Sequence, residues 1–406
     1  MNVPKLRFKE FTDEWSFSSF NEIFSILNGY AFSSKDFISS QEIILTKIAN
    51  VDFNCMSKDN LSFLPKEYLN KYSKFILNRN DIVIALTRPI LNNNLKIAIV
   101  DDFFDKSLLN QRVGKIISKH NNLFVYYMLQ TKKCINSINI SIAGTDPPNL
   151  SPEKITYIKK YLPQSKEQNK IANFLTTVDK KITNLENIIT SLENQKKGLL
   201  QQIFSQKLRF KDKNGNNYPN WEKKKLEDIG SFSRGGNLSK SDLSKKGTSC
   251  ILYGELYTYY NEFATEIKSK TLNTTNLVLS KKYDVLLPLS GETAEDISTC
   301  TCIFFDDIAL GNDLLIFRSS FFDGRFMSLL LKYKYKYKIA QIAQGKSIVH
   351  ISEKNIKSIN IKIPCIEEQQ NIADFILIFT KKLENQKAQL KHWKQIKKGL
   401  LQQMFV

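Results

Sequence analysis

The chain is poor in the residue types that most often carry catalysis and bind metals. Its 406 residues include only 3 histidines and 6 cysteines. No histidine has a partner at metal-ligand or triad spacing. Cys300-Thr301-Cys302 has no second Cys or His pair near it in the sequence, so we expect no metal site. Cysteines scattered in this way are typical of a reduced, cytoplasmic protein.

Long apolar runs are also missing. No stretch approaches the roughly 20 residues that a membrane-spanning helix needs. The first residues, Met1 to Arg7, lack the apolar segment of a signal peptide. We therefore expect a cytoplasmic protein without a membrane partner.

One short motif resembles a catalytic sequence. Adenine-N6 methyltransferases use Asn/Asp-Pro-Pro-aromatic to stack a flipped base. Here Asp146-Pro147-Pro148-Asn149 ends in Asn, so the stacking ring is missing, and no Gly-rich cofactor loop follows a strand earlier in the chain. We expect a turn at this position, and a chain that binds without catalysing a reaction and without a cofactor of its own.

The most informative feature present is a long internal repeat. Lys196-Lys197-Gly198-Leu199-Leu200-Gln201-Gln202 recurs, residue for residue, 201 positions later. Further matched pairs are 5–9 with 207–211, 163–174 with 364–375, Trp15 with Trp221, and Gly29 with Gly235. The middles, roughly 40–140 and 245–340, are hard to align. The sequence therefore predicts two related modules with a shared scaffold and different targets.

The charge is basic in both copies. Residues 1–205 carry 27 Lys and Arg and 19 Asp and Glu, a net +8, and residues 206–406 carry 32 and 21, a net +11. Two basic modules and a pI near 9.4 favour a polyanionic partner. A Lys-rich, AT-rich coding background explains the same excess equally well, so charge alone does not decide.

Each copy ends in a heptad pattern typical of a long helix with a helical partner. The apolar seam positions are Ile171, Leu175, Val178, Ile182, Leu185, Ile189, Leu192, Leu199 and Ile203 in the first copy, and Ile372, Ile376, Phe379, Leu383, Leu390, Trp393, Leu400 and Met404 in the second. Lys196 interrupts the first seam, and Gln386 and Lys397 interrupt the second. The first seam spans about 50 Å.

The order of the repeated pieces resembles a ring cut at one point. Helix one leads from module one into Lys207 to Lys211, whereas the segment that matches it for helix two, Lys5 to Lys9, lies at the other end of the chain. The sequence therefore predicts antiparallel helices, pseudo-twofold symmetry and neighbouring termini.

The modules mix strand-like and helix-like segments. We expect strands over 43–48, 81–86 and 96–100, a helix over 124–134, and closing strands over 155–162 and 357–363. The predicted class is α+β, with two pseudo-symmetric α/β modules at 1–163 and 207–364 and two long antiparallel coiled-coil helices within 164–206 and 365–406.

Taken together, the repeated Pro-x-x-x-x-Glu-Gln-x-x-Ile-x-x-Phe segment, the heptad helix ending in Lys-Gly-Leu-Leu-Gln-Gln and the variable middles resemble the DNA-specificity subunit of type I restriction-modification systems. The resemblance covers essentially the whole chain. It implies that each variable block is a target recognition domain that reads one half of a split, asymmetric site on double-stranded DNA.

The resemblance also implies the partners. The helices would act as a fixed spacer and dock two methyltransferase subunits, and motor-nuclease restriction subunits would join them. S-adenosylmethionine, ATP and Mg would belong to those partner subunits, and this chain would be the non-catalytic subunit of the complex.

For DNA contact we select polar residues at predicted strand ends and in matched loops, because base edges and phosphates are read by such side chains. They are Tyr30, Lys47, Thr87, Arg88, Gln111, Arg112 and Thr145 in module one, and Arg234, Lys240, Ser290, Asn312 and Lys346 in module two. The alternative for each is a solvated surface residue. The Lys332 to Lys338 run of alternating Lys and Tyr is equally consistent with a phosphate-facing edge and a solvated helix.

Two other functions compete with this one. A coiled-coil scaffold without sequence-specific DNA binding predicts duplex binding that is absent or equally weak on all sequences. A self-sufficient methyltransferase predicts binding of S-adenosylmethionine by the isolated chain, and the missing cofactor loop argues against it.

Overall fold

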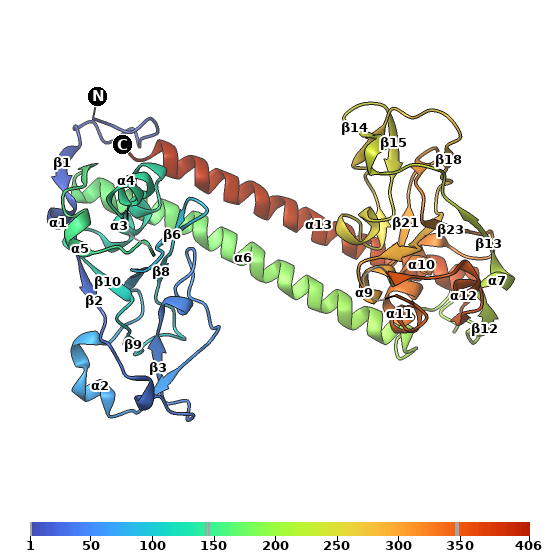
Figure 1. Ribbon diagram of the computed structural model, residues 1–406, viewed down its shortest axis with the longest axis horizontal. Coiled ribbons are helices and arrows are strands. Elements are labelled where there is room, and N and C mark those ends of the chain that lie inside the picture. Colours follow the sequence, from blue (N-terminus) through green and yellow to red (C-terminus); the bar gives the residue numbers. More distant parts are fainter. Residues whose placement is uncertain (1, 143, 145–146, 346–348) are drawn as a thin grey trace. The chain divides into compact units, whose positions relative to one another are not determined.

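Figure 1 shows the computed structural model, which describes residues 2–142, 144, 147–345 and 349–406. Contacts divide the chain into two compact units, unit 1 (residues 1–186 and 388–406) and unit 2 (residues 187–387). Each unit contains one α/β module and part of both long helices, which confirms the predicted α+β class. The helical segments predicted as separate regions are therefore shared between the two units.

Unit 1 is built on a four-stranded antiparallel sheet, order β2-β10-β5-β8, and a three-stranded sheet, order β4-β3-β9. Its strands are β1 Ser16–Ser19, β2 Phe24–Asn28, β3 Ile43–Thr46, β4 Phe63–Leu64, β5 Ile82–Ala85, β6 Ile90–Leu91, β7 Asn94–Leu95, β8 Ile97–Ile99, β9 Leu108–Leu109, β10 Val113–Ser118 and β11 Lys159–Leu162. Its shorter helices are α1 Phe20–Ile23, α2 Tyr68–Lys71, α3 Asn122–Leu129, α4 Lys132–Ile142 and α5 Pro152–Ile155, with 3-10 turns η1 Ser34–Asp36, η2 Ile48–Asn50 and η3 Ser73–Phe75.

Unit 2 repeats this plan with two five-stranded sheets, order β13-β23-β19-β21-β16 and order β14-β17-β15-β22-β18. Its strands are β12 Glu222–Lys225, β13 Ser231–Arg234, β14 Leu243–Ser244, β15 Thr248–Ile251, β16 Phe263–Ala264, β17 Ser269–Thr271, β18 Val278–Leu279, β19 Val285–Pro288, β20 Ser290–Gly291, β21 Thr301–Ile303, β22 Ala309–Leu310, β23 Leu314–Arg318, β24 Val349–His350 and β25 Asn360–Ile363. Its shorter helices are α7 Leu226–Ile229, α8 Glu255–Thr258, α9 Ala294–Ile297, α10 Gly324–Leu329, α11 Lys336–Gln341 and α12 Glu353–Lys357, with the 3-10 turn η4 Lys240–Asp242 and the π-helix η5 Leu330–Lys334.

One inner strand of each unit, β5 in unit 1 and β19 in unit 2, is buried on both faces. In β5, Ile82 and Ile84 pack with the helices of one cluster, whereas Val83 belongs to a second cluster. In β19, Val285 joins one cluster and Leu286 another. Successive side chains of a strand point to opposite faces, so a continuous apolar run is what a strand covered on both sides requires.

Several predicted elements differ in extent. The helix expected over 124–134 is two helices, α3 and α4, because the chain breaks at Gln130 and Thr131, where the hydroxyl of Thr131 bonds the carbonyl oxygen of Met128 at 2.8 Å. The closing strands are only β11 and β25, since the residues before them form α5 and α12 behind the N-cap positions Ser151 and Ser352.

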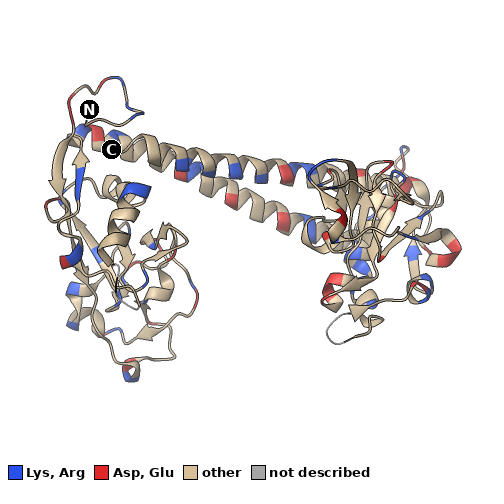
Figure 2. Ribbon diagram, turned by 45° about the horizontal axis from the view of Figure 1, so that its top comes forward, with Lys and Arg blue, Asp and Glu red and all other residues tan. Residues whose placement is uncertain are grey.

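The two long helices are α6, Ser165–Phe204, and α13, Ile366–Gln403. Within unit 2, Lys387 of α13 pairs with Glu193 of α6 at 2.6 Å. Within unit 1, Lys394 pairs with Glu186 at 2.7 Å and Lys397 with Asp179 at 2.7 Å. The residue numbers of α13 rise along these pairs as those of α6 fall, so the pairing is antiparallel. Figure 2 shows Lys and Arg in blue and Asp and Glu in red along both helices.

The apolar seam is buried most completely in α6. Its buried members are Ile171, Leu175, Val178, Ile182, Leu185, Ile189, Leu192 and Ile203, together with Leu200, whereas Leu199 is half-buried. In α13 the buried members are Ile372, Ile376, Leu383 and Met404, and the half-buried ones are Phe379, Leu390, Trp393 and Leu400. Near the end of α6 the buried side chains include Lys196 and Leu200, and Leu199 is not fully buried. The reason is that a helix has 3.6 residues per turn and drifts from a strict heptad.

An arginine–glutamate pair fixes the head of each long helix. Arg7 donates two hydrogen bonds of 2.8 Å to the carboxylate of Glu167 in unit 1, and Arg209 donates bonds of 2.6 and 2.8 Å to Glu368 in unit 2. Both carboxylates are buried, with side-chain exposures of 3% and 0%. The repeated Glu of each copy therefore binds the repeated Arg that starts its own module.

A T-shaped pair of rings stands next to each ion pair. Phe8 packs on Phe174 with centroids 5.8 Å apart, and Phe210 packs on Phe375 at 5.6 Å. We call each set of Arg, Glu and two Phe residues a head clamp. Two paired bonds and one ring contact account for the repeated Arg-Phe and Glu-x-x-x-x-x-x-Phe spacings.

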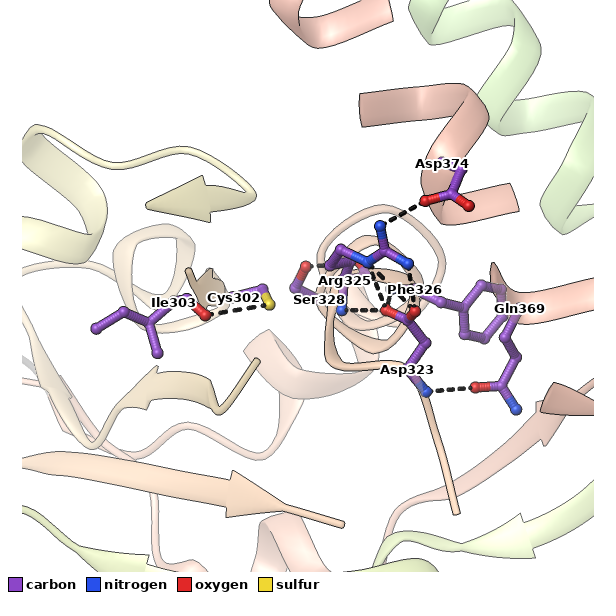
Figure 3. A network of polar contacts seen from close by, with 8 residues as sticks. All are labelled: Cys302, Ile303, Asp323, Arg325, Phe326, Ser328, Gln369 and Asp374. Atoms are coloured by element: carbon purple, nitrogen blue, oxygen red, sulfur yellow. Dashed lines mark hydrogen bonds and ion pairs between the residues drawn. The ribbon is translucent and has the colours of Figure 1, made fainter. Parts of the chain in front are cut away.

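The repeated glutamine caps a second helix. Gln369 donates from Nε2 to the carbonyl oxygen of Pro364 at 2.9 Å and accepts from the backbone N–H of Asp323, the N-cap of α10, at 2.9 Å. Figure 3 shows this contact and Arg325 lying between Asp323 and Asp374. Gln168 makes the matching bonds in unit 1, to Pro163 and Asn121.

The end of each long helix meets the start of a module. The N–H of Leu208 bonds the carbonyl oxygen of Gln202 at 3.1 Å, a few residues away in the chain, and the N–H of Leu6 bonds the matching oxygen of Gln403 at 2.9 Å. The predicted closure of the ring is thus present in unit 1 as a non-covalent contact. Among the described residues, no helix is long and apolar enough to cross a membrane.

The head clamp predicts a large loss of stability on substitution. Changing Glu368→Gln leaves the Arg209 guanidinium without its counter-charge, and we expect the free energy of unfolding of unit 2 to fall by about 3–5 kcal/mol, measured by urea titration. The control Glu193→Gln breaks an ion pair whose side chains are 47% and 53% exposed. It should cost about 0–1 kcal/mol, and equal losses in the two variants would refute the role of the clamp.

The ring closure predicts that a residue near the end of α13 stabilises the first module. Phe405 is 6% exposed and its ring lies 5.3 Å from that of Phe124. Phe405→Ala should cost about 3–5 kcal/mol and raise amide hydrogen exchange in unit 1. The matched variant Phe204→Ala, whose ring lies 6.2 Å from Phe326, should act on unit 2. Unchanged exchange in unit 1 with Phe405→Ala would show that the contact is dispensable.

Candidate nucleic-acid interface

In unit 1 the ends of three strands meet at one edge of the central sheet. The N–H of Gln111 bonds the carbonyl oxygen of Tyr30 at 2.9 Å, and the N–H of Leu86 bonds that of Arg112 at 3.0 Å. Thr87 and Asn149 form a β-bridge. The structure therefore brings five of the predicted residues together, which we call cluster 1: Tyr30, Thr87, Arg88, Gln111 and Arg112.

Cluster 1 presents cationic and amide groups to solvent. Arg88, Gln111 and Arg112 are exposed, and Tyr30 is 40% exposed. Arg88 has a φ of 47°, which is uncommon for a residue with a side chain, and its N–H bonds the carbonyl oxygen of Pro148 at 2.8 Å. Lys47 follows β3 and donates to the hydroxyl of Ser62 at 2.7 Å, so its ammonium already has a partner.

Unit 2 repeats the backbone contacts of this edge. The N–H of Leu289 bonds the carbonyl oxygen of Asp313 at 2.7 Å, and the N–H of Ile351 bonds that of Leu289 at 3.0 Å. These match the bonds of Leu86 and Leu150 in unit 1. The residues at corresponding positions of the two edges are Ser290 and Thr87, Asn312 and Gln111, Asp313 and Arg112, and His350 and Asn149.

The side chains at this second edge differ. Ser290 is 4% exposed, and its hydroxyl lies 3.1 Å from an Asp313 carboxylate oxygen and 2.9 Å from Nδ1 of His350. Arg234 ends β13 and donates to Glu353 at 3.4 Å, and Asn312 is exposed. We call Arg234, Ser290, Asn312, Asp313 and His350 cluster 2. Lys240 lies apart, exposed in η4.

The repeated glycines explain how the first strand of each edge comes so close. A Cβ atom on Gly29 would clash with the carbonyl oxygen of Asn110, and one on Gly235 with that of Gly311. The backbone at Gly29 or Gly235 can approach the turn before β10 or β23 this closely only because glycine has no side chain. The same two glycines therefore place Tyr30 and Gly236 at the edge of their sheets.

The two clusters offer different hydrogen-bonding groups. Guanidinium and amide groups such as Arg112 and Gln111 donate in the pattern that suits guanine and adenine in the major groove. A carboxylate such as Asp313 accepts, which suits the amino group of cytosine. The exchange of Arg for Asp at matched positions replaces a positive charge by a negative one, so cluster 1 has two cations and cluster 2 has one cation and one anion.

Sequence reasoning missed Asp313 and His350. The repeat offset aligns them with Arg112 and Asn149, and this alignment was the signal that could have found them. Thr145 and Lys346, which were also predicted to touch DNA, lie outside the described residues.

The four lysines of the Lys332 to Lys338 run each have a hydrogen-bond acceptor within unit 2. Lys332 donates to Asn261 at 2.7 Å, Lys334 to the carbonyl oxygen of Phe204 at the end of α6, and Lys336 to Glu295 at 2.9 Å. Lys338 also donates, to the carbonyl oxygen of Asn360 at 3.3 Å. Tyr337 and Lys338 are exposed on α11, so this part of the run has a solvated face, and its contact with phosphate stays a prediction.

Metal-binding chemistry is not indicated in the described part of the chain, where no group of three or more His, Cys, Asp or Glu side chains could hold an ion. Burial raises the pKa of the Cys300 thiol to about 12, so this sulfur is a neutral core group. Pro148 accepts a hydrogen bond from the N–H of Arg88 and Asn149 pairs with Thr87, so these two residues of the motif contribute backbone pairing to cluster 1. Asp146 lies outside the described residues.

Two curated relatives are specificity subunits. The chain is 32% identical over 216 residues to the type I restriction enzyme MjaVIII specificity subunit of Methanocaldococcus jannaschii, covering 52% of this chain and 51% of that protein. It is 22% identical over 399 residues to the putative type I restriction enzyme MjaX specificity subunit of the same organism, covering 92% and 88%. The chain thus spans about half the length of the first relative.

Solved structures share the fold. The S subunit of a type I restriction-modification system from M. genitalium superposes with a TM-score of 0.64 at 14% identity, covering 100% of this chain and 99% of that one. The sequence model described as type I restriction modification DNA specificity domain matches residues 12–194 and again 218–392. The chain therefore belongs to the family of type I restriction-modification DNA specificity proteins, with two copies of the family's domain.

Proposed function

We propose that this chain is the sequence-specific DNA-binding subunit of a type I restriction-modification complex, in which each module reads one half of a bipartite, asymmetric site. One observation carries the proposal most directly. Clusters 1 and 2 occupy the same place in two copies of one domain, with the same backbone bonds and different side chains. A duplicated scaffold with unlike polar edges suits a protein that reads two different sequences.

The two half-sites should differ in their bases. Cluster 1 presents Arg88, Gln111 and Arg112, which favour guanine and adenine, and cluster 2 presents Asn312 and Asp313, which favour adenine and cytosine. Exposed Lys and Arg elsewhere on each unit supply phosphate contacts, which position the protein and make its affinity depend on salt.

The long helices suit a fixed spacer. A helix of 40 residues such as α6 is about 60 Å long, whereas one turn of B-DNA is about 34–36 Å. Interhelical ion pairs at Glu193, Glu186 and Asp179 mark one antiparallel register, and the buried seam side chains of α6 hold it. We infer that two short read sequences flank several unread base pairs.

Catalysis belongs to partners in this proposal. One similar solved chain, with a TM-score of 0.52, comes from work on complex assembly of the type I R-M system. We infer that two methyltransferase subunits dock on the helices and that restriction subunits join them. These subunits would bring S-adenosylmethionine, ATP and Mg, and the complex would act in the cytoplasm.

Methylation mapping tests the proposal. Genomic DNA from a host that expresses this chain with its methyltransferase partner should carry methyladenine in one split motif, and deletion of the gene should remove that motif alone. Partner subunits must be shown to be active with another specificity subunit. An unchanged methylome under those conditions would favour the scaffold alternative, in which the chain joins proteins without reading DNA.

Arg112→Ala should weaken binding to the mapped site about tenfold or more and relax preference in the half read by module one only. Asp313→Ala should act on the other half. Affinities for duplexes altered in either half measure both effects, and Lys132→Ala, an exposed cation on α4, is the control. Loss of affinity shared equally by the two halves would contradict the assignment.

A seven-residue insertion in both helices tests the spacer. Placed after Glu193 in α6 and before Lys387 in α13, it lengthens both helices at a level where they pair. The methylated motif should gain about three unread base pairs, because seven residues add about 10.5 Å. The same insertion in α6 alone breaks the register and should abolish methylation, whereas an unchanged spacing with both insertions would reject the spacer role.

A further inference from the structure

The break in the first heptad seam is a buried cation. Lys196 lies in α6 with a relative exposure of 6%, and its ammonium pairs with the carboxylate of Glu262, whose side chain is 0% exposed. Glu262 lies between α8 and β16, in the middle part of the second copy that does not align with the first. The helix is thus tied to the variable part of its module.

Glu262 also receives bonds from two other elements of unit 2. The hydroxyl of Thr380 on α13 donates to one carboxylate oxygen at 3.2 Å, and the hydroxyl of Tyr333 on η5 donates to the other at 3.0 Å. Burial alone would raise the pKa of this carboxyl, but the charge and hydrogen bond of Lys196, together with the charge of Lys332 and a backbone hydrogen bond, lower it. One ionised side chain therefore joins α6, α13 and the variable region.

The matched lysine of the other copy has its carboxylate in a different place. Lys397 pairs with Asp179 at 2.7 Å, and Asp179 is a residue of α6 itself. Tyr127 completes this site with a bond of 2.9 Å to the same carboxylate. Asp179 and Thr380 are matched positions of the repeat, so unit 1 has an acid on the helix where unit 2 has a hydroxyl.

A buried ammonium requires a counter-charge, because removing one partner of a buried ion pair leaves an uncompensated charge in a poorly solvated site. In unit 1 Lys397 is only half-buried, with 13% of its side chain exposed, and the two helices supply its counter-charge through Asp179. In unit 2 the threonine at position 380 cannot supply a charge, and the variable region supplies it instead.

We propose that Lys196 and Glu262 are positioning residues that fasten the second reading module to the helices, and that the residue at position 380 decides whether a module in this place must bring its own carboxylate. A foreign module that lacks an acid at the position of Glu262 would then need the substitution Thr380→Asp, which matches the acid of the first copy at Asp179. This inference rests on the proposed function for its effect on DNA reading.

Four full-length variants test it: Glu262→Gln, Thr380→Asp, the double variant, and Glu227→Gln as a control at an exposed acid of α7 whose ion pair with Lys225 lies at the surface of unit 2. Each is assayed for melting temperature and for affinity to duplexes that carry the mapped site with either half altered. Glu262→Gln should lower the melting temperature of unit 2 by roughly 10 °C, and the control should not change it.

The double variant separates stability from positioning. The carboxylate introduced by Thr380→Asp should restore most of the melting temperature, because it gives Lys196 a counter-charge from the helix. The gain in affinity that an intact second half-site provides should stay about tenfold smaller than in the native chain, which is the effect of one mismatched base pair. The reason is that the ion pair between Lys196 and the module is still missing. The first half-site should be read normally throughout.

Two outcomes would overturn the proposal. An unchanged melting temperature in Glu262→Gln would show that Lys196 does not need this partner. If the double variant distinguishes intact from altered second half-sites as well as the native chain does, Glu262 only neutralises the charge of Lys196 and does not position the second module. If the native chain binds all duplexes alike, the proposed function fails, and the melting temperatures still decide the role of the ion pair.

Discussion

The head clamp is the interaction on which the rest of the fold depends. A buried glutamate at the start of each long helix binds an arginine from the start of the same module, about 160 residues earlier. Each module is thereby closed on its own helix, while the end of the other helix joins it through Leu6 or Leu208. Because every unit contains parts of both helices, neither module is complete without the antiparallel pair.

The two copies of the domain share this scaffold and differ in their middle parts, which we propose to be the parts that read DNA. The repeated residues contact one another or the fold next to them: Arg pairs with Glu, Phe packs on Phe, and Gln accepts a hydrogen bond from the N-cap residue of a helix. The strand ends are fixed by backbone bonds and a glycine, so side chains there can change without loss of the fold. The lysine that is repeated in each long helix is the exception: half-buried Lys397 takes its carboxylate from α6, whereas buried Lys196 takes its carboxylate from the variable region.

The sequence predicts the long helices and the repeated residues better than it predicts the contacts of the variable middle parts. A seven-residue identity and a heptad leave strong periodic signals, so the duplication, the antiparallel helices and the ring closure were all predictable. The pairing of Lys196 with Glu262 was not, because the sequence shows a lysine in a seam but not which distant acid faces it. The acceptors of Lys332 and Lys336 were not predictable for the same reason, since alternating Lys and Tyr does not show which distant groups the ammonium groups bond.

If the two modules read different half-sites, as proposed, and the helices act as a fixed spacer, the distance between the half-sites is fixed. The most direct measurement is the affinity of the assembled complex for duplexes in which the two mapped half-sites are kept intact and the unread segment is shortened or lengthened by one base pair. One base pair shifts a half-site by about 3.4 Å and rotates it around the helix axis, so a fixed scaffold predicts a steep loss of affinity in both directions. Equal affinity for all spacings would contradict the account.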